Sequence, residues 1–205
     1  MPARGDHEAR RAEVSEAVWL VLAARGFGGL TLRAVAAQMG VSTGLLTHYF
    51  PDKRSLIRHA VDVAERRAQQ RTRHSSEQEG LPALRSALLD VLPLTPESVA
   101  MSRVWVGYWD GALVDEDLGM NQQRRYARWR AALREHIADA RRDGEVGDTD
   151  PDDLAAISAA FAHGLVVQAL FDPGRFPPVR QTELLDQFLD GLAASGARPF
   201  RGTRT

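Results

Sequence analysis

The sequence has 205 residues, of which 44% are hydrophobic and 26% charged, values typical of a soluble globular protein with one large or two unequal domains. It contains no cysteine, which excludes disulfides, thiolate metal sites and cysteine nucleophiles and fits a reducing cytoplasm. Residues 1–11 are polar and charged, and no apolar segment of a signal peptide follows them. We therefore expect a cytoplasmic protein.

The net charge of −1 conceals an uneven distribution along the chain. Residues 1–75 hold twelve Lys and Arg against seven Asp and Glu, whereas the remaining residues hold fourteen against twenty. The N-terminal third can face a polyanion, and the rest would repel one. This asymmetry is typical of a nucleic-acid-binding module attached to a larger domain.

Apolar residues recur at spacings of three and four almost everywhere, and Gly or Pro interrupts the pattern at helix-length intervals. The sequence therefore predicts an all-α protein with about nine helices. The first helix is expected over residues 8–25, because Gly26 follows where a left-handed cap belongs. A short second helix follows Thr31, which can cap it, and ends at Gly40.

Polar caps also mark the next two helices. Ser42 can cap a third helix over residues 43–49, and Asp52 can cap a fourth over residues 53–73. A polar break follows at residues 75–80, where we place a domain boundary.

Prolines begin the later helices, because Pro is favoured in a first helical turn. Pro82, Pro96 and Pro151 each stand at such a position, the last among aspartates that suit a helix N-terminus. The longer helices are expected over residues 96–113, 117–143, 151–171 and 180–194. The predicted organisation is a DNA-binding domain (1–53), a connecting helix shared by both domains (54–80), an effector-binding and dimerisation domain (81–196) and a flexible tail (197–205).

Two short helices separated by Gly40, Val41 and Ser42 are the sequence form of a helix-turn-helix. The glycine allows the sharp turn, Val41 fills the space between the helices, and the second helix presents its first turn to the major groove. Small residues in that turn, Thr43 and Gly44, allow close approach to base edges. Donors suited to bases or phosphates surround them: Arg33, Thr47, His48, Tyr49 and Lys53.

The segments TLRAVA at 31–36 and GVSTGLLTHYFPDK at 40–53 resemble the signature of the TetR family of one-component repressors. The resemblance implies a dimer that binds a palindromic operator and is released by a small-molecule effector. It implies base contacts from Arg33, Thr43, Gly44 and Leu45, and phosphate contacts from Thr31, Ser42, Thr47, Tyr49 and Lys53. Two positions depart from the family: Thr47 stands where an aromatic residue is common, and Ala34 where an acidic one is common.

Residues 154–171 are apolar almost all the way round. A membrane span is the alternative, but the stretch is near the lower length limit and carries polar groups, so we predict a doubly buried helix and no membrane contact. Together with the last helix it could form a four-helix dimer interface across a twofold axis. The predicted interface residues are Phe161, Leu165, Gln168, Leu184, Leu185, Phe188 and Leu192.

An aromatic concentration marks a candidate effector pocket, comprising Trp105, Tyr108, Trp109, Asp110, Tyr126 and Trp129. Such rings can enclose an organic cation with help from a carboxylate, although Trp at helical spacing is more often core. The pattern also resembles the choline-responsive subgroup of the same family. His136 and His163 lie outside any recognised ligand spacing, and we expect no metal and no cofactor.

Two other classes of protein share features of this sequence. Residues 40–44 match the G-x-S-x-G nucleophile elbow of α/β-hydrolases, but that elbow needs a buried strand before Ser42, whereas residues 32–39 have helical spacing, so we expect no enzyme. A helical adaptor that binds another protein is the second alternative. It differs from a DNA-binding protein in lacking a clustered basic surface.

Overall fold

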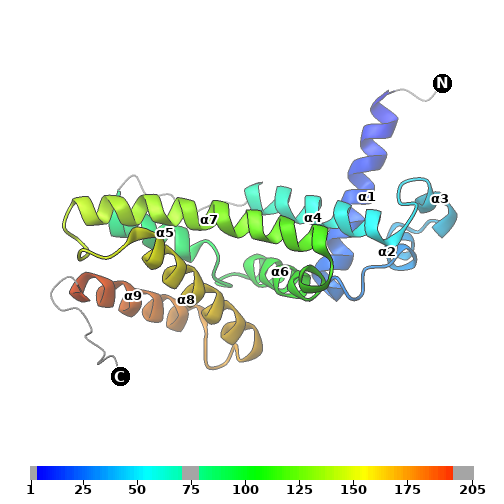
Figure 1. Ribbon diagram of the computed structural model, residues 1–205. Helices are drawn as coiled ribbons and strands as arrows, with labels where there is room; N and C mark the ends of the chain where they lie inside the picture. The colour runs from blue at the N-terminus through cyan, green and yellow to red at the C-terminus, as the bar shows by residue number, and fades with distance from the viewer. Residues whose placement is uncertain (1–3, 71–78, 196–205) are drawn as a thin grey trace. The chain divides into compact units, whose positions relative to one another are not determined.

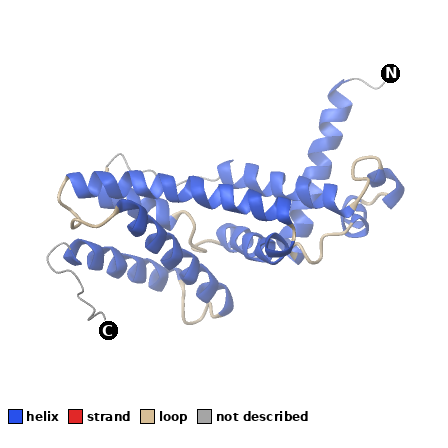
Figure 2. Ribbon diagram, viewed as in Figure 1, coloured by secondary structure: helices blue, strands red, loops and turns tan. Residues whose placement is uncertain are grey.

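The computed structural model describes residues 4–70 and 79–195 (Figure 1). Nine α-helices and no strand occur within these two ranges (Figure 2). They are α1 (Arg4–Arg25), α2 (Leu32–Met39), α3 (Thr43–Thr47), α4 (Lys53–Gln70), α5 (Gly80–Leu89), α6 (Pro96–Val114), α7 (Glu116–Arg142), α8 (Pro151–Phe171) and α9 (Pro178–Ser195). The prediction of an all-α protein with about nine helices is confirmed.

The chain divides into two compact units. The first joins residues 1–71 to residues 103–111 of α6, and the second joins residues 72–102 to residues 112–205. The domain boundaries expected from the sequence remain predictions. The expected tail, 197–205, lies outside the described residues.

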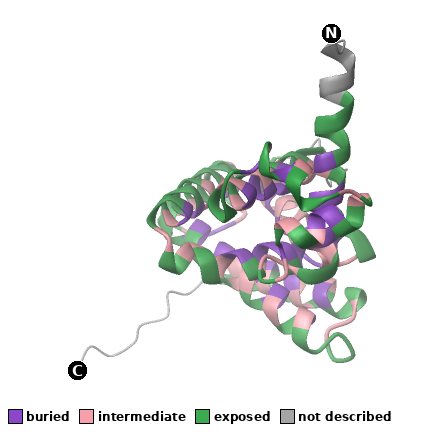
Figure 3. Ribbon diagram, turned by 90° about the vertical axis from the view of Figure 1, so that its right-hand side faces the viewer, coloured by how far each residue is buried: buried purple, intermediate pink, exposed green. Residues whose placement is uncertain are grey.

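In the first unit, α1 packs against α2 and α4, and α2 packs against α3. Val18, Leu22, Val35 and Leu56 are almost completely buried there. Figure 3 colours the helices by burial, with the buried residues in purple. Burying an aliphatic side chain of this size contributes about 1.5–3 kcal/mol, so these residues supply much of the stability of the unit. Gly26 ends α1 with a φ of 62°, as the sequence predicts.

The core of the second unit lies among α5, α7, α8 and α9. Leu88, Leu133, Ile137 and Leu185 are 0–1% exposed. The Nε atom of Arg85 on α5 donates to the carboxylate of Asp186 on α9 over 2.6 Å, and its Nη2 atom donates over 3.0 Å. This forked pair fixes the rotation of α9 against α5.

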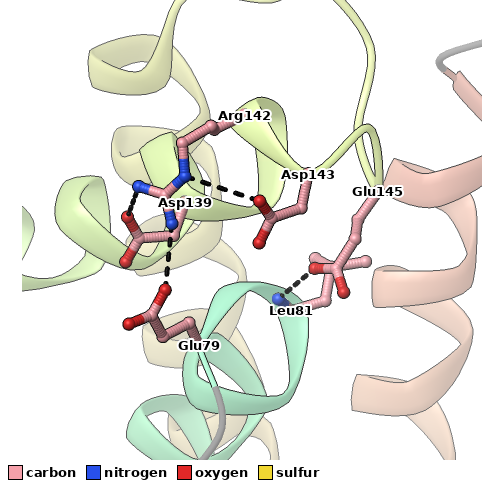
Figure 4. A network of polar contacts seen from close by, with 6 residues as sticks. All are labelled: Glu79, Leu81, Asp139, Arg142, Asp143 and Glu145. Atoms are coloured by element: carbon pink, nitrogen blue, oxygen red, sulfur yellow. Dashed lines mark hydrogen bonds and ion pairs between the residues drawn. The ribbon is translucent and has the colours of Figure 1, made fainter.

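The start of α5 is held by a carboxylate from outside the helix. Gly80 has a φ of 69°, and the next residue, Leu81, donates its backbone N–H to Glu145 over 2.7 Å (Figure 4). Arg142 sits beside this corner, donating to Asp139 over 2.8 Å and to Glu79 over 2.9 Å. The sequence places the first turn of α5 at Pro82. In the structure the helix begins two residues earlier, at Gly80.

Two further expectations about local structure are wrong. Helix α3 ends at Thr47 and not at Tyr49, because Pro51 disfavours helical geometry at residue 50, whose N–H still bonds to the carbonyl of Leu46. Ser42 stands at the N-cap of α3 but its side chain makes no capping hydrogen bond. The predicted extension of α4 to Arg73 passes beyond the described residues.

Helix α8 is the only helix among the described residues that is long and apolar enough to cross a membrane. Length and composition alone are weak support for a span, because the core helix of a soluble protein has both. The most apolar window of α8 is 44% buried, and α8 packs along α7 and contacts α5 and α9. One face of α8 is exposed in the single chain, with Ile157 at 52%, so the doubly buried helix that the sequence predicts stays a prediction.

Candidate nucleic-acid interface and ligand site

The turn between α2 and α3 has the geometry of a helix-turn-helix. The Oγ1 atom of Thr31 accepts the N–H of Ala34 over 3.0 Å, which confirms its role as the cap of α2. Gly40 has a φ of 67° and bonds through its N–H to the last turn of α2, and the Val41 N–H bonds to the Ala36 carbonyl over 3.0 Å. Only glycine enters this backbone region without strain.

Helix α3 is anchored by one side and exposed on the other. Leu46 is completely buried, whereas Thr43, Gly44, Thr47 and His48 are exposed. Leu45 and Tyr49 lie between these extremes and are half-buried. The first turn of α3 therefore presents small polar residues to the surrounding solution, as an element that enters the major groove must.

Thr47 uses its hydroxyl proton within the helix. Its Oγ1 atom donates to the carbonyl of Gly44 over 2.7 Å, so this hydroxyl can still accept a hydrogen bond but has no proton left for a phosphate oxygen. The family resemblance implies a phosphate contact from Thr47. In this conformation such a contact would need the hydroxyl to rotate away from Gly44.

The beginning of α4 is capped as the sequence predicts. Asp52 accepts the N–H of Ser55 over 2.6 Å, and this hydrogen bond, followed by one from the Ser55 side chain, holds the pKa of Asp52 below its ordinary value. Lys53 and Arg54 are exposed in the first turn. Both the partly positive helix end and these two cations favour a phosphate there.

His59 on α4 contacts both α1 and the loop that follows α3. His59 lies 3.1 Å from the hydroxyl of Ser15, and its ring centroid is 5.2 Å from that of Phe50. Burial and then the charge of Arg66 lower the pKa of His59. The neutral ring is therefore favoured, and it packs between α1 and Phe50 in the loop after α3.

The aromatic residues predicted to line an effector pocket are divided between the two units. In the first unit, Tyr108 is 2% exposed and packs against Phe27 and Trp105, with centroid distances of 5.3 and 5.9 Å. Trp109 is half-buried and Asp110 is exposed. The packing of Tyr108 and Trp105 is that of core residues, the alternative that the sequence leaves open.

In the second unit, Tyr126 and Trp129 on α7 enclose a residue that sequence reasoning did not include. Their ring centroids lie 5.0 and 4.8 Å from that of His163 on α8. These three side chains, with Arg130 and three alanines of α8, line a cavity of 260 Å³. Burial raises the pKa of Tyr126 and lowers the pKa of His163 to about 4, so both side chains are neutral near pH 7.

The predicted dimer residues form two groups. Phe161 and Phe188 stack with centroids 4.3 Å apart, and Gln168 is exposed, whereas Leu165 and Leu185 are buried within the chain itself. Leu184 and Leu192 are half-buried. Other apolar residues on these two helices are more exposed: Ile157 at 52%, Phe171 at 82% and Val179 at 66%. The sequence does not reveal that these three residues are exposed, because their exposure depends on how the helices are rotated.

Two family models match the chain. Residues 81–194 match the C-terminal domain of BetI-type transcriptional repressors, and residues 16–60 match the bacterial regulatory proteins of the tetR family. This chain belongs to the TetR family of transcriptional regulators. The TetR match at 16–60 contains the whole α2–turn–α3 segment and every predicted DNA contact.

Full-length relatives agree with this assignment. The HTH-type transcriptional regulator PksA of Bacillus subtilis is 25% identical, with 97% of each chain covered. The HTH-type transcriptional regulator BetI of Paraburkholderia phymatum is 26% identical over 96% of this chain and 100% of its own length. A transcriptional regulator from Saccharomonospora viridis, crystallised in complex with choline, has the same fold: its TM-score is 0.75 at 22% identity, with 90% of this chain and 96% of that chain covered.

The nucleophile-elbow alternative lacks its structural setting in this TetR-family regulator. Ser42 follows helix α2, and no strand occurs within the described residues, whereas the elbow requires a strand before its serine. The pattern at residues 40–44 is accounted for by the sharp turn between α2 and α3.

Proposed function

We propose that this regulator is a homodimeric repressor that acts in the cytoplasm, binds a palindromic DNA operator and is released by a small organic molecule. The observation that supports it most directly is the exposed first turn of α3, held by the buried Leu46 and flanked by Lys53 at the start of α4. Residues 26–61 carry four Lys and Arg against one Asp, so this surface is clearly cationic.

Dimerisation would make this surface specific. Two reading helices related by a twofold axis match a palindrome when they lie about 34–36 Å apart, one turn of the duplex. The stacked Phe161 and Phe188, with the exposed Ile157, give α8 and α9 an apolar surface suited to a second copy.

Binding of the effector would release DNA by favouring a different spacing of the two α3 helices. This requires that the effector bind the two spacings with unequal affinity. The choline complex of the Saccharomonospora viridis protein makes an organic cation the first ligand to test. Against a cation at the Tyr126–Trp129–His163 cavity stands its lining, which includes Arg130 and no carboxylate.

The decisive experiment is a gel shift at near-physiological salt with fragments of the chromosomal region around the gene. We expect one or a few fragments to bind at least roughly a thousandfold more tightly than random duplex of the same length. Equal affinity for all fragments would remove the proposal. Choline added to the specific complex then tests the ligand: release of DNA supports an organic cation, and no release at millimolar choline excludes choline.

A further inference from the structure

A broad groove runs along the first unit beside the recognition helix. It is bounded by α1, α3 and α4 and has a volume of 1170 Å³. Leu45, His48 and Tyr49 form its wall on the side of α3, so the groove is continuous with the surface that the sequence assigns to DNA. Its size exceeds the usual range of small-molecule pockets, about 300–1,000 Å³, which favours a larger ligand.

Three arginines line this groove, and they differ in what they contact. Arg67 pairs with Glu16, the one carboxylate in the lining, and its guanidinium lies 4.7 Å from the ring centroid of Trp19. Arg11 and Arg66 are exposed and form no ion pair with a described residue. Among the described residues, the groove therefore carries two arginines that have no ion-pair partner.

Arg11 lines the groove together with Leu45, His48 and Tyr49, next to the surface that the sequence assigns to DNA. Along α1 and α4, Ser15 meets His59, and Glu16 and Trp19 meet Arg67 further along α4. The N-terminal direction of α1 therefore leads toward the start of α4, where Lys53 stands. Arg66 lies thirteen residues beyond Lys53, about 20 Å along a helix that rises 1.5 Å per residue.

We infer that Arg11 binds the sugar–phosphate backbone of the duplex just outside the base pairs read by α3. The inference rests on the proposed function, because it takes operator DNA as the polyanion. It extends the DNA interface from α2, α3 and α4 to α1. The contact is one of position and charge, and it carries no sequence information of its own.

The test is the salt dependence of DNA affinity. Each phosphate contact contributes about 0.9 to the slope of log K against log salt concentration, so Arg11→Ala should reduce the slope by about 1.8 in a dimer. Affinity near 100 mM salt should fall roughly tenfold for operator and random duplex alike. Arg11→Lys should keep most of the slope, because a charge and not a fork of hydrogen bonds is required.

Matched controls come from the same helices. Arg10→Ala removes a neighbouring arginine that already pairs with Glu13 over 2.8 Å, and Arg66→Ala removes the other exposed arginine of the groove, which stands thirteen residues beyond Lys53 on α4. Both should leave the slope unchanged. Equal losses in all three alanine variants would show a general effect of net charge and overturn the inference, as would an unchanged slope in Arg11→Ala. A reduced slope in Arg11→Ala and Arg66→Ala but not in Arg10→Ala would overturn it in favour of DNA bound along the whole groove.

A second measurement locates the contact on the DNA. An operator duplex shortened to the base pairs read by α3 lacks the flanking phosphates, so the wild type and Arg11→Ala should bind it equally well. A persistent difference on the short duplex would contradict the flanking position. If the wild type prefers no sequence at all, the proposed function fails. If the wild type binds its operator specifically and Arg11→Ala binds the long duplex with the same affinity, the proposed function stands and only the contact of α1 with DNA fails.

Discussion

Individual residues at the α2–turn–α3 surface divide by what they can touch. Lys53, exposed at the start of α4, is predicted to contact the backbone of DNA, whereas Thr43 in the first turn of α3 is predicted to contact base edges. The predicted contacts are the same residues that the structure leaves exposed or half-buried, apart from the bonded hydroxyl of Thr47.

Substituting these two residues should therefore have different consequences. Lys53→Ala should weaken binding to every duplex by a similar factor, roughly tenfold, and reduce the salt slope. Thr43→Ala should change the ranking of operator variants by about 1–3 kcal/mol at one base pair and leave random duplex unaffected. Competition binding against a library of single-base operator variants measures both. Uniform effects from both substitutions would contradict the assigned roles.

His163 is the residue whose ionisation should influence stability most clearly. Burial lowers its pKa in the folded state to about 4, below the ordinary value of 6.5. The unfolded chain therefore binds more protons than the folded chain between about pH 4 and 6.5, and stability should fall as the pH drops through this window. The slope should approach but not exceed about 1.4 kcal/mol per pH unit.

Urea unfolding at several pH values between 4.5 and 7.5 tests this prediction. His163→Phe keeps a ring between Tyr126 and Trp129 but cannot ionise. Other groups titrate in both proteins, so their effects cancel in the comparison. The unfolding free energy of the wild type minus that of His163→Phe should therefore decrease as the pH falls. A difference independent of pH would show that His163 ionises normally.

At the scale of helices, the start of α5 depends on a single glycine. Gly80 has a φ of 69°, and a Cβ atom there would lie 2.3 Å from the Oε2 atom of Glu145, the carboxylate that accepts the Leu81 N–H. Gly80→Ala should therefore destabilise the protein by about 1–3 kcal/mol, from backbone strain and a disturbed cap.

The matched control for this helix start is Gly174→Ala. Gly174 lies in the loop between α8 and α9 outside the positive-φ region, and the nearest atom to its Cβ would be 3.8 Å away. It should change stability by less than about 0.5 kcal/mol. Chemical denaturation compares the two variants. Equal stability of Gly80→Ala and the wild type would show that the corner drawn in Figure 4 accommodates a Cβ atom without strain.

At the scale of the whole molecule, oligomeric state is the property that decides whether the DNA surface is duplicated. Ile157 is 52% exposed on α8, so Ile157→Arg should leave the folded chain intact while placing an unpaired charge in the proposed dimer interface. The dissociation constant of the dimer should rise on the order of a hundredfold.

Light scattering coupled to size-exclusion chromatography would measure this effect at micromolar concentration. Leu113→Arg is the control, because Leu113 is 87% exposed and lies on α6, outside the proposed interface. A wild-type monomer, or an undisturbed dimer in Ile157→Arg, would refute the interface. A monomeric variant that keeps full operator affinity would instead separate dimerisation from DNA binding.

Much of this molecule follows from the sequence because its determinants are local. Thr31, Gly40, Asp52 and the prolines act within one or two turns, so the helices and the helix-turn-helix were predictable, including the exact span of α8. At the start of α5 local reasoning was not sufficient, because Glu145, distant in sequence, accepts the N–H of Leu81 in the first turn.

Only the tertiary structure decided which face of each helix meets which neighbour. The packing of Tyr108 on Phe27, the position of His163 between Tyr126 and Trp129, and the groove that holds Arg11 all join segments far apart in sequence. Helical periodicity identifies an apolar face but does not name its partner, because the burial of such a face is nearly non-directional. Side chains of similar chemistry thus become core, pocket or interface according to helix packing.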